Sequence, residues 1–268
     1  MPSKYACVDG GAVNYLHTGP TTLPDVVPPL DRGRLLLFVH AAGGTAGLWR
    51  KQIESLGREH SAVALDLPGH GRSAGVDGLA TVEAYADFVA RFSGVLGLRP
   101  VVLVGRSMGG AIGLTLAASR PELVQALVLV CTAARFELAP DRIASARDVA
   151  RGRLPQQFTT ETFSPASGMD VMREAWTEQV KTDPRVRYGD LLACERFDGR
   201  PLLDRVRVPT LVVAGADDHV TPPACGEALA RGIRSARLEV IERAGHQAPL
   251  EQADAFGTVV VGFLRELA

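Results

Sequence analysis

The chain has 268 residues, which is enough for one large domain or for a core with a small insertion. Hydrophobic residues make up 46% of the chain and charged residues 22%, a balance typical of globular proteins. The formal net charge is −1, so no overall field favours nucleic acid or an anionic membrane, and we expect neither as a partner.

Short apolar runs rich in Val and Leu alternate with longer stretches of helical periodicity along most of the chain. Residues 5–8 and 12–17 flank the turn sequence Asp9-Gly10-Gly11, and this pattern predicts a hairpin. Further strands are expected at residues 35–39, 62–65, 101–104, 126–130, 210–213 and 238–241. Helices are expected at residues 47–56, 82–97, 108–119, 223–232 and 254–267.

The strand-like runs are apolar on both faces, which predicts a parallel sheet covered by helices on both sides. We therefore expect an α/β fold with a mostly parallel central sheet of about eight strands, mixed at the edge where the leading hairpin joins it. The alternation breaks off between about residues 133 and 207, where charge increases and aromatic residues are widely separated. This stretch predicts a mostly helical insertion at 133–207 in a core formed by residues 1–132 and 208–268.

Nothing in the sequence predicts a metal site, a membrane span or export. The four cysteines, Cys7, Cys131, Cys194 and Cys225, form no CxxC pair and have no metal-ligand spacing, so we expect free thiols and no metal. No apolar run approaches the roughly 20 residues that a membrane helix requires, and the first residues lack the pattern of a signal peptide. We expect a cytoplasmic protein without stable membrane insertion, either a monomer or a homodimer.

The clearest local motif is Gly105-Arg106-Ser107-Met108-Gly109, between the predicted strand at 101–104 and the predicted helix at 108–119. In that context a G-x-S-x-G sequence predicts a sharp turn that exposes a nucleophilic serine hydroxyl. The start of the following helix adds a positive partial charge beside the hydroxyl. Ser107 is therefore the candidate nucleophile, and the alternative is a glycine-rich packing turn.

A serine nucleophile needs a general base, and a histidine base needs a carboxylate to orient it. Of the six histidines, His246 follows a predicted strand and precedes the last helix, where ligands meet a parallel sheet. His40 also follows a strand, but the small, glycine-rich residues after it suit backbone contact with an oxyanion. The loop after strand 210–213 offers two carboxylates, Asp217 and Asp218, and spacing alone leaves both open.

With these motifs in order, the chain resembles the α/β-hydrolase family over nearly its whole length. The resemblance rests on residues 40–44, 66–73, 105–110 and 215–222, and on Gly245-His246 followed by Glu251. It implies a helical cap after the sixth strand. It also implies Asp218 as the acid of the triad. For Asp217 we expect that it caps or braces the turn. The oxyanion donors that the resemblance implies are the backbone N–H groups of Ala42 and Met108.

The function that the resemblance implies is hydrolysis of carboxylic esters of small, largely apolar substrates through an acyl-enzyme on Ser107. It requires no metal and no organic cofactor. The first alternative is a related hydrolase that cleaves carbon–carbon bonds, enol-lactones or thioesters, or forms peracids. Relatives that cleave carbon–carbon bonds carry asparagine before the nucleophile and tryptophan after the base, where this chain has Arg106 and Gln247. The second alternative is a non-catalytic small-molecule receptor, which does not require all three triad groups.

The predicted insertion contains apolar side chains that are candidates for a substrate pocket, although each also suits packing within the insertion itself. These residues are Phe136, Phe158, Phe163, Met169, Met172, Trp176 and Phe197. Next to the nucleophile, Arg106 offers a positive charge either to an acidic substrate or to a nearby carboxylate of the protein.

Overall fold

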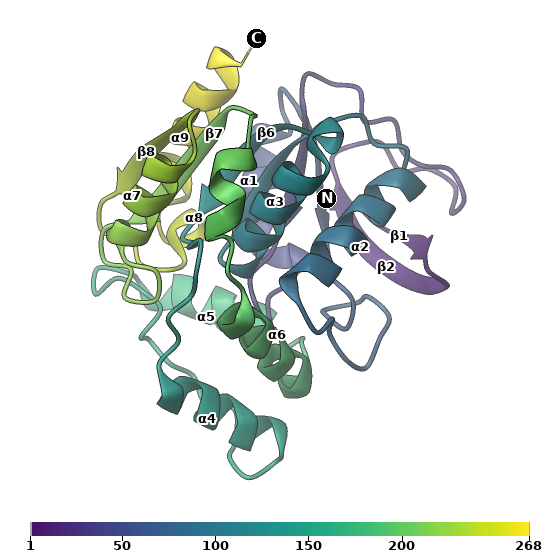
Figure 1. The fold of residues 1–268 in the computed structure, drawn as a ribbon. Coiled ribbons are helices and arrows are strands. Elements are labelled where there is room, and N and C mark those ends of the chain that lie inside the picture. The colour runs from purple at the N-terminus through teal and green to yellow at the C-terminus, as the bar shows by residue number, and fades with distance from the viewer. Residues whose placement is uncertain (1, 268) are drawn as a thin grey trace.

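A central sheet of eight strands runs through the molecule in the computed structural model, which describes residues 2–267 (Figure 1). In chain order the strands are β1 (Ser3–Val8), β2 (Gly11–His17), β3 (Leu35–Val39), β4 (Ser61–Leu65), β5 (Val101–Arg106), β6 (Val124–Val130), β7 (Thr210–Gly215) and β8 (Ala236–Ile241). They lie side by side in the order β1-β2-β4-β3-β5-β6-β7-β8. The β1–β2 and β2–β4 pairs are antiparallel, and all the other pairs are parallel.

The strand order changes direction at β3, because the chain adds β4 on one side of β3 and then β5 on the other. In the register of β3 and β5, Val39 lies opposite Gly105, so the loops after these two strands leave the sheet side by side. Open parallel sheets bind ligands at such a switch point, outside the carboxyl ends of the strands. The loops that carry His40 and Ser107 both begin there.

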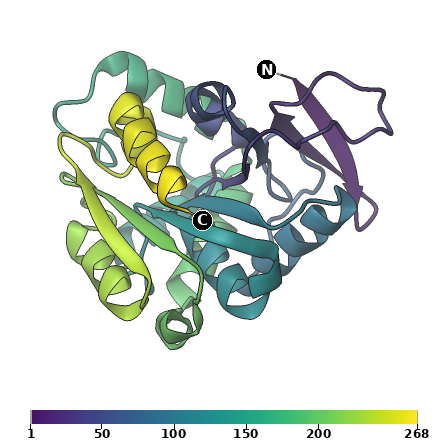
Figure 2. The ribbon, with the colours of Figure 1, turned by 90° about the horizontal axis from the view of Figure 1, so that it is seen from above.

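Helices cover both faces of the sheet, as the doubly apolar strands predict. One face carries α1 (Arg50–Leu56) and α9 (Ala253–Glu266), and the other carries α2 (Val82–Val95), α3 (Met108–Ser119) and α7 (Pro223–Gly232) (Figure 2). Successive residues of β3 enter two separate cores. Leu37 packs on the side of α2 and α3, whereas Phe38 packs on the side of α1 and α9. The sheet is thus the buried middle layer of three.

The chain between β6 and β7 is here called the β6–β7 segment (residues 131–209). Most of it lies beyond the carboxyl ends of the strands, and its last part returns beside α3 and α7 to the start of β7 (Figure 1). It contains α4 (Pro140–Ala150), α5 (Met169–Gln179), α6 (Pro184–Arg196) and the 3-10 helix η3 (Arg200–Arg205). α4 packs against α6, and α5 packs against two short core helices, η1 (Ala46–Trp49) and α8 (Ala248–Glu251). A third short helix, η2 (Pro121–Leu123), leads from α3 into β6.

The predicted fold class is confirmed, with the mostly parallel eight-stranded sheet and the antiparallel edge. One predicted helix, 47–56, is divided into η1 and α1, because the Thr45 hydroxyl accepts a hydrogen bond from Gly47 N–H and caps a separate 3-10 turn. Other element bounds differ from the prediction by a few residues. No helix within residues 2–267 combines the length and the apolar character needed to cross a membrane.

Candidate active site

Ser107 lies in the turn between β5 and α3, in a backbone conformation that a residue with a side chain rarely adopts. Its φ is +53° and its ψ is −118°. The Ser107 N–H donates to the carbonyl of Val130 at 2.9 Å, and its carbonyl accepts from Thr132 Oγ1 at 2.7 Å. These hydrogen bonds to the end of β6 hold the strained turn in place.

Two glycines of the motif allow the chain to fold back tightly on itself. A Cβ atom at Gly105 would lie 2.1 Å from the carbonyl oxygen of Gly109, and one at Gly109 would lie 2.2 Å from the carbonyl oxygen of Val39. Both distances are far below van der Waals contact, so only glycine fits at either position. The start of α3 consequently packs directly on the end of β3, beside the loop that begins at His40.

His246 and Asp218 form a buried hydrogen-bonded pair in the loops after β8 and β7. The Nδ1 atom of His246 lies 2.9 Å from Asp218 Oδ2. Asp218 Oδ2 also accepts from the Thr221 hydroxyl at 2.8 Å, and its Oδ1 accepts the N–H groups of Val220 and Thr221 at 2.8 and 2.9 Å. Because the carboxylate is fixed by these bonds, it can fix the orientation of the imidazole in turn.

The surroundings of this pair suit a neutral base beside an ionised acid. Burial lowers the pKa of His246 below 6.5; Asp218 raises it, and the positive charges of Arg106 and Arg142 lower it further. Burial alone would raise the pKa of Asp218, but His246 and the hydrogen bonds from Thr221 bring it below its usual value. At neutral pH His246 is therefore uncharged and able to accept a proton.

The third link of the predicted relay is not formed in this structure. Among residues 2–267, neither Ser107 Oγ nor His246 Nε2 has a hydrogen-bond partner. Ser107 and His246 nevertheless belong to adjacent loops. Arg106, the residue before Ser107, donates from its guanidinium to the main-chain oxygen of His246 at 3.2 Å. Serine–histidine hydrogen bonds are often long without substrate and shorten in the reacting complex.

Two backbone N–H groups are free on the turns beside Ser107. The N–H groups of Ala42 and Met108 donate to no acceptor among the described residues, whereas their neighbours are engaged. Gly44 N–H donates to the Ala41 carbonyl at 2.9 Å, and Gly43 N–H donates to Asp190 Oδ2 at 2.8 Å. Free N–H groups at the start of a helix are suited to a developing negative charge.

The loop of His246 is held by a carboxylate whose role the sequence did not indicate. Glu251 accepts the N–H groups of Gly245 at 3.0 Å and Gln247 at 2.9 Å, and also that of Ser164 in the β6–β7 segment at 2.8 Å. The side chain of Asp217 accepts the Ser164 hydroxyl at 2.5 Å. The expectation that Asp217 braces its own turn is therefore wrong, because its carboxylate bonds to the β6–β7 segment instead.

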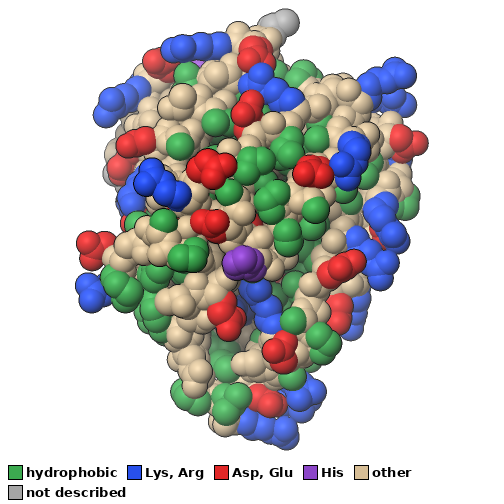
Figure 3. Space-filling view, turned by 90° about the vertical axis from the view of Figure 1, so that its left-hand side faces the viewer, with side chains coloured by type: hydrophobic (Ala, Val, Ile, Leu, Met, Phe, Trp, Pro, Cys, Tyr) green, Lys and Arg blue, Asp and Glu red, His purple; other side chains and the backbone are tan. Residues whose placement is uncertain are grey.

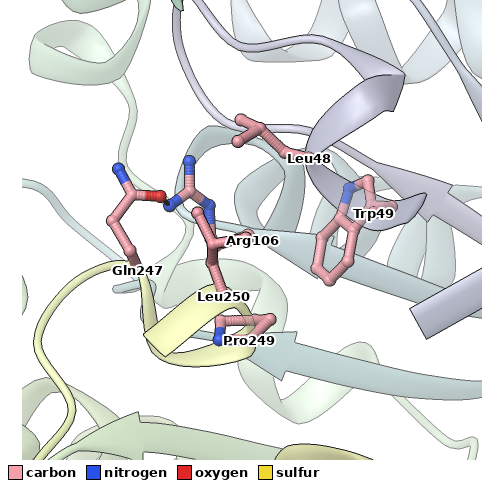
Figure 4. Close-up of a pocket in the computed structure, with 6 residues that line it drawn as sticks. All are labelled: Leu48, Trp49, Arg106, Gln247, Pro249 and Leu250. Atoms are coloured by element: carbon pink, nitrogen blue, oxygen red, sulfur yellow. Dashed lines mark hydrogen bonds between the residues drawn. The ribbon is translucent and has the colours of Figure 1, made fainter. Parts of the chain in front are cut away.

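Arg106 contacts the histidine loop rather than a carboxylate. Its guanidinium donates to the main-chain oxygen of His246 and to Gln247 Oε1, and it takes part in no ion pair among residues 2–267. Figure 4 shows it at the wall of a small pocket, whose other lining residues are Leu48, Trp49, Gln247, Pro249 and Leu250. The predicted pairing of Arg106 with a carboxylate of the protein is therefore not found, and its contact with an acidic substrate stays a prediction.

A second buried polar cluster connects the β6–β7 segment to the His40 loop. Asp190, on α6, lies 2.7 Å from His70 Nε2, accepts the Tyr85 hydroxyl at 2.6 Å, and accepts Gly43 N–H at 2.8 Å. Burial is the largest single influence and lowers the pKa of His70, but the charge and hydrogen bond of Asp190, together with smaller contributions from Pro68 and Asp66, raise it above 6.5. The ring of His40 lies beside that of His70 with centroids 4.7 Å apart. No pattern in the sequence indicates this cluster, because Asp190 is more than 100 residues along the chain from each of His70, Tyr85 and Gly43.

The apolar candidates of the insertion lie in three different places. Phe136 and Phe197 pack together in the main core, with ring centroids 6.4 Å apart. Phe163 and Met172 form a small cluster with Leu250. Phe158 and Trp176 form an edge-to-face pair, with Phe158 39% exposed, and Met169 is 51% exposed. These side chains thus pack in separate groups, and their contact with a substrate stays a prediction.

No group of three or more His, Cys, Asp or Glu side chains within the described part of the chain is arranged to hold a metal ion. The site is instead defined by a serine in a strained strand–turn–helix junction and a histidine–aspartate pair at the same edge of a mostly parallel sheet. This combination defines a class of protein: the chain belongs to the α/β hydrolase fold family, whose sequence model matches residues 34–253. The predicted resemblance is confirmed, and the chain is a hydrolase of this family.

Similar proteins of known name cover almost the whole chain. The pimeloyl-(acyl-carrier protein) methyl ester esterase of Neisseria meningitidis is 29% identical over 256 residues, which are 91% of this chain and 96% of that protein. The enol-lactonase of Burkholderia xenovorans is 28% identical with a TM-score of 0.82, and covers 98% of this chain and 100% of its own. A thermophilic esterase of Thermogutta terrifontis is 27% identical with a TM-score of 0.83. The match covers 100% of this chain and 99% of the esterase.

Proposed function

We propose that this chain is a serine esterase in which Ser107 is the nucleophile, His246 the general base and Asp218 the acid that orients the imidazole. The observation that carries the proposal is the buried His246–Asp218 pair, 2.9 Å apart, in the loop next to a serine held at a positive φ. Strain of this kind persists where the surrounding structure enforces it, and it is common at sites of reaction. The similar esterases support the same class of reaction.

In the proposed reaction Ser107 Oγ attacks the ester carbonyl while His246 Nε2 takes its proton. The free N–H groups of Ala42 and Met108 donate to the oxyanion that forms. His246 then gives the proton to the leaving alcohol, which completes the acyl-enzyme, and the same imidazole activates water for deacylation. Asp218 remains ionised throughout and keeps Nδ1 protonated.

We further propose that residues 133–207 act as a cap over this site. The support is the position of α4, α5 and α6 beyond the carboxyl ends of the strands, where Ser107 and His246 lie. Hydrogen bonds from Ser164 to Glu251 and Asp217 join the cap to the loops that carry the histidine and the acid. A substrate between cap and core would be shielded from bulk water while it reacts.

The test combines turnover of short 4-nitrophenyl esters with labelling by a serine-directed phosphonate, read by mass spectrometry. Ser107→Ala should lower kcat by a factor on the order of 10⁴ or more and abolish labelling. Ser119→Ala is the matched control, because Ser119 is an exposed residue of α3 outside the site. Near-full activity of Ser107→Ala, or labelling of another serine, would refute the assignment, and labelling without turnover of any ester would favour the receptor.

A second candidate is hydrolysis of an enol-lactone by the same triad, favoured by the similarity to the enol-lactonase along 98% of this chain. A lactone is an internal ester, so attack, oxyanion and proton transfers are unchanged, and only the leaving group stays attached. A panel of linear esters, lactones and dienone acids separates these reactions. A kcat/KM for an enol-lactone above that of every linear ester would favour the second candidate.

A further inference from the structure

Two arginines of the β6–β7 segment are partly buried and form no ion pair within the described part of the chain. Arg142 lies on α4 and Arg187 on α6, and α4 packs against α6. Neither guanidinium takes part in a hydrogen bond or ion pair among the described residues. Other arginines of the same segment behave differently: Arg185 pairs with Asp183, and Arg200 pairs with Asp198.

Both side chains lie at the proposed catalytic site. The side-chain carbons of Arg187 cover Gly43, where an added Cβ would lie only 2.7 Å from Arg187 Cγ. Gly43 directly follows Ala42, the proposed oxyanion donor. The charge of Arg142 lowers the pKa of His246. Burial lowers the pKa of Arg142, and the charges of Glu161 and Asp218 raise it, so Arg142 is within electrostatic range of the histidine–aspartate pair.

The two charges also act unfavourably on each other. Burial lowers the pKa of each guanidinium, and the positive charge of Arg142 lowers that of Arg187 further. Bringing two like charges together out of water is costly unless an anion joins them. A guanidinium is also a planar donor that matches a carboxylate with two parallel hydrogen bonds.

No carboxylate within residues 2–267 forms an ion pair with either guanidinium, and the charges of Glu161 and Asp218 act on Arg142 only from beyond ion-pair distance. Asp190, the carboxylate of α6 nearest to the Gly43 loop, is already engaged by His70, Tyr85 and Gly43. Asp218 is engaged by His246 and Thr221. On the face of the molecule that carries β8 and α7, Figure 3 shows a hollow with hydrophobic side chains inside and a Lys or Arg side chain at its rim.

We infer that Arg142 and Arg187 form an anion subsite, and that the natural substrate is an ester or lactone that carries a carboxylate. This inference rests on the proposed function and narrows its substrate class. The carboxylate would bind between the two guanidinium groups while the scissile carbonyl lies at Ser107. The substrate is then apolar along its chain and charged at one end, as a half-ester of a dicarboxylic acid is.

The experiment compares kcat/KM for three 4-nitrophenyl esters of similar length at pH 8, where His246 is neutral. They are the hydrogen glutarate, which carries a carboxylate; the valerate, which is uncharged; and 4-(trimethylammonio)butyrate, which is cationic. We expect the hydrogen glutarate to be preferred over the valerate by about tenfold or more, and the cationic ester to be the poorest. A fourth ester, of 4-phosphonobutyric acid, distinguishes the anions: a tenfold preference for it over the hydrogen glutarate would overturn the assignment to carboxylate.

The variants Arg142→Gln and Arg187→Gln should each reduce the preference for the hydrogen glutarate over the valerate by about tenfold, mainly through KM. Arg142→Lys and Arg187→Lys should retain part of it, because the charge remains. Arg151→Gln is the matched control: Arg151 is exposed at the end of α4, and its loss should leave the preference unchanged. Should a Gln variant fail to fold, the salt dependence of KM in the natural chain gives the answer, because only the anionic ester should bind more weakly with added NaCl.

The outcomes separate this inference from the proposal on which it rests. Suppose that the valerate is hydrolysed through Ser107, but the arginine variants leave the ratio of kcat/KM for the hydrogen glutarate to that for the valerate unchanged. The anion subsite is then refuted, and the proposal of a serine esterase stands. If no ester is turned over and the phosphonate does not label Ser107, the proposed function itself has failed.

Discussion

At the scale of single residues, the site depends on how closely the chain can approach itself. Gly109→Ala places a Cβ 2.2 Å from the carbonyl oxygen of Val39 and 2.7 Å from that of His40, both backbone atoms that cannot move aside cheaply. We expect a loss of about 1–3 kcal/mol in the free energy of unfolding, because overpacking shifts backbone. Because the turn at Ser107 shifts as well, kcat should fall by more than tenfold. Chemical denaturation and ester turnover measure the two effects.

The control for that variant is Gly94→Ala on α2, where an added Cβ meets nothing within 4 Å. Alanine is a better helix former than glycine, so this change should raise the free energy of unfolding by up to about 1 kcal/mol. It should leave kcat unchanged. Equal effects of the two substitutions would show that helix propensity, and not contact with β3, decides the outcome at Gly109.

The protonation of His246 sets the pH dependence of the proposed reaction. The base acts in its neutral form, and its pKa lies below 6.5. We therefore expect kcat/KM for an uncharged ester to be constant above pH 7 and to fall on acidification only below pH 6.5. In Arg142→Gln a nearby positive charge is lost, so the imidazole holds its proton more tightly and the fall should begin at a higher pH. Arg151→Gln should leave the profile unchanged, and so would Arg142→Gln if its guanidinium were remote from His246.

How far the sequence determined the site also differs from residue to residue. The turn at Ser107 was predictable because Gly105 and Gly109 are local to it. The choice of Asp218 over Asp217 was not: both follow β7, and only the resemblance to a family favoured one. Arg142 and Arg187 could not be predicted as site residues, because an arginine on a helix is usually solvated, and their burial depends on the packing of α4 on α6.

At the scale of elements, α6 connects the β6–β7 segment to the loop that carries the proposed oxyanion donor. The connection is Asp190, whose carboxylate holds His70, Tyr85 and the N–H of Gly43 in a fully buried position. Helical periodicity can place this residue on an inward face, but its partners are 105, 120 and 147 residues away along the chain. A sequence pattern has no access to contacts at such separations.

Asp190→Asn tests this connection. The amide has nearly the same shape, but it removes the charge that raises the pKa of His70 and weakens the hydrogen bond to Gly43. We expect a loss of roughly 1.5–3 kcal/mol in the free energy of unfolding, the usual value of a hydrogen bond to a charged group. Because Gly43 follows Ala42, kcat should fall more than KM rises.

The matched control is Asp198→Asn, which changes an exposed aspartate that pairs with Arg200 at the surface. Surface ion pairs contribute little to stability, so the unfolding midpoint and kcat should both be unchanged. A purely structural role for Asp190 predicts a different result: the free energy of unfolding would fall while kcat of the folded fraction stayed the same.

At the scale of the whole molecule, the sheet was predictable and the segment above it was not. Most of the eight strands are short and apolar, so they are recognisable alone, and helical stretches separate most of them. The β6–β7 segment lacks this property: α4 and α6 carry many charged residues and bury only part of one face. Their positions depend on contacts with each other and with the loops around Ser107, which exist only after the sheet has formed.

The buried histidines make the stability of the whole fold depend on pH. Burial lowers the pKa of His17, His40, His60 and His246 below 6.5, whereas His70 has a raised pKa. As the pH falls below 6.5, the unfolded chain binds protons at the first four positions and the folded chain does not. His70 does not offset this, because below pH 6.5 it is protonated in both states. The stability that the charged His70 contributes is instead lost at higher pH, as the pH rises through the pKa of His70 in the folded protein.

We therefore expect the free energy of unfolding to be greatest near neutral pH and to decrease from pH 6.5 toward pH 5. For each of the fully buried His40 and His246, the slope is about 1.4 kcal/mol per pH unit until the folded pKa is reached. His40→Asn should give a less stable protein with a shallower slope, since one proton fewer is taken up on unfolding. His219→Gln, which changes an exposed histidine, should leave the slope unchanged. Urea titrations of both variants at several pH values measure the slope. If His40→Asn leaves the slope unaltered, groups other than His40 cause the loss of stability in acid.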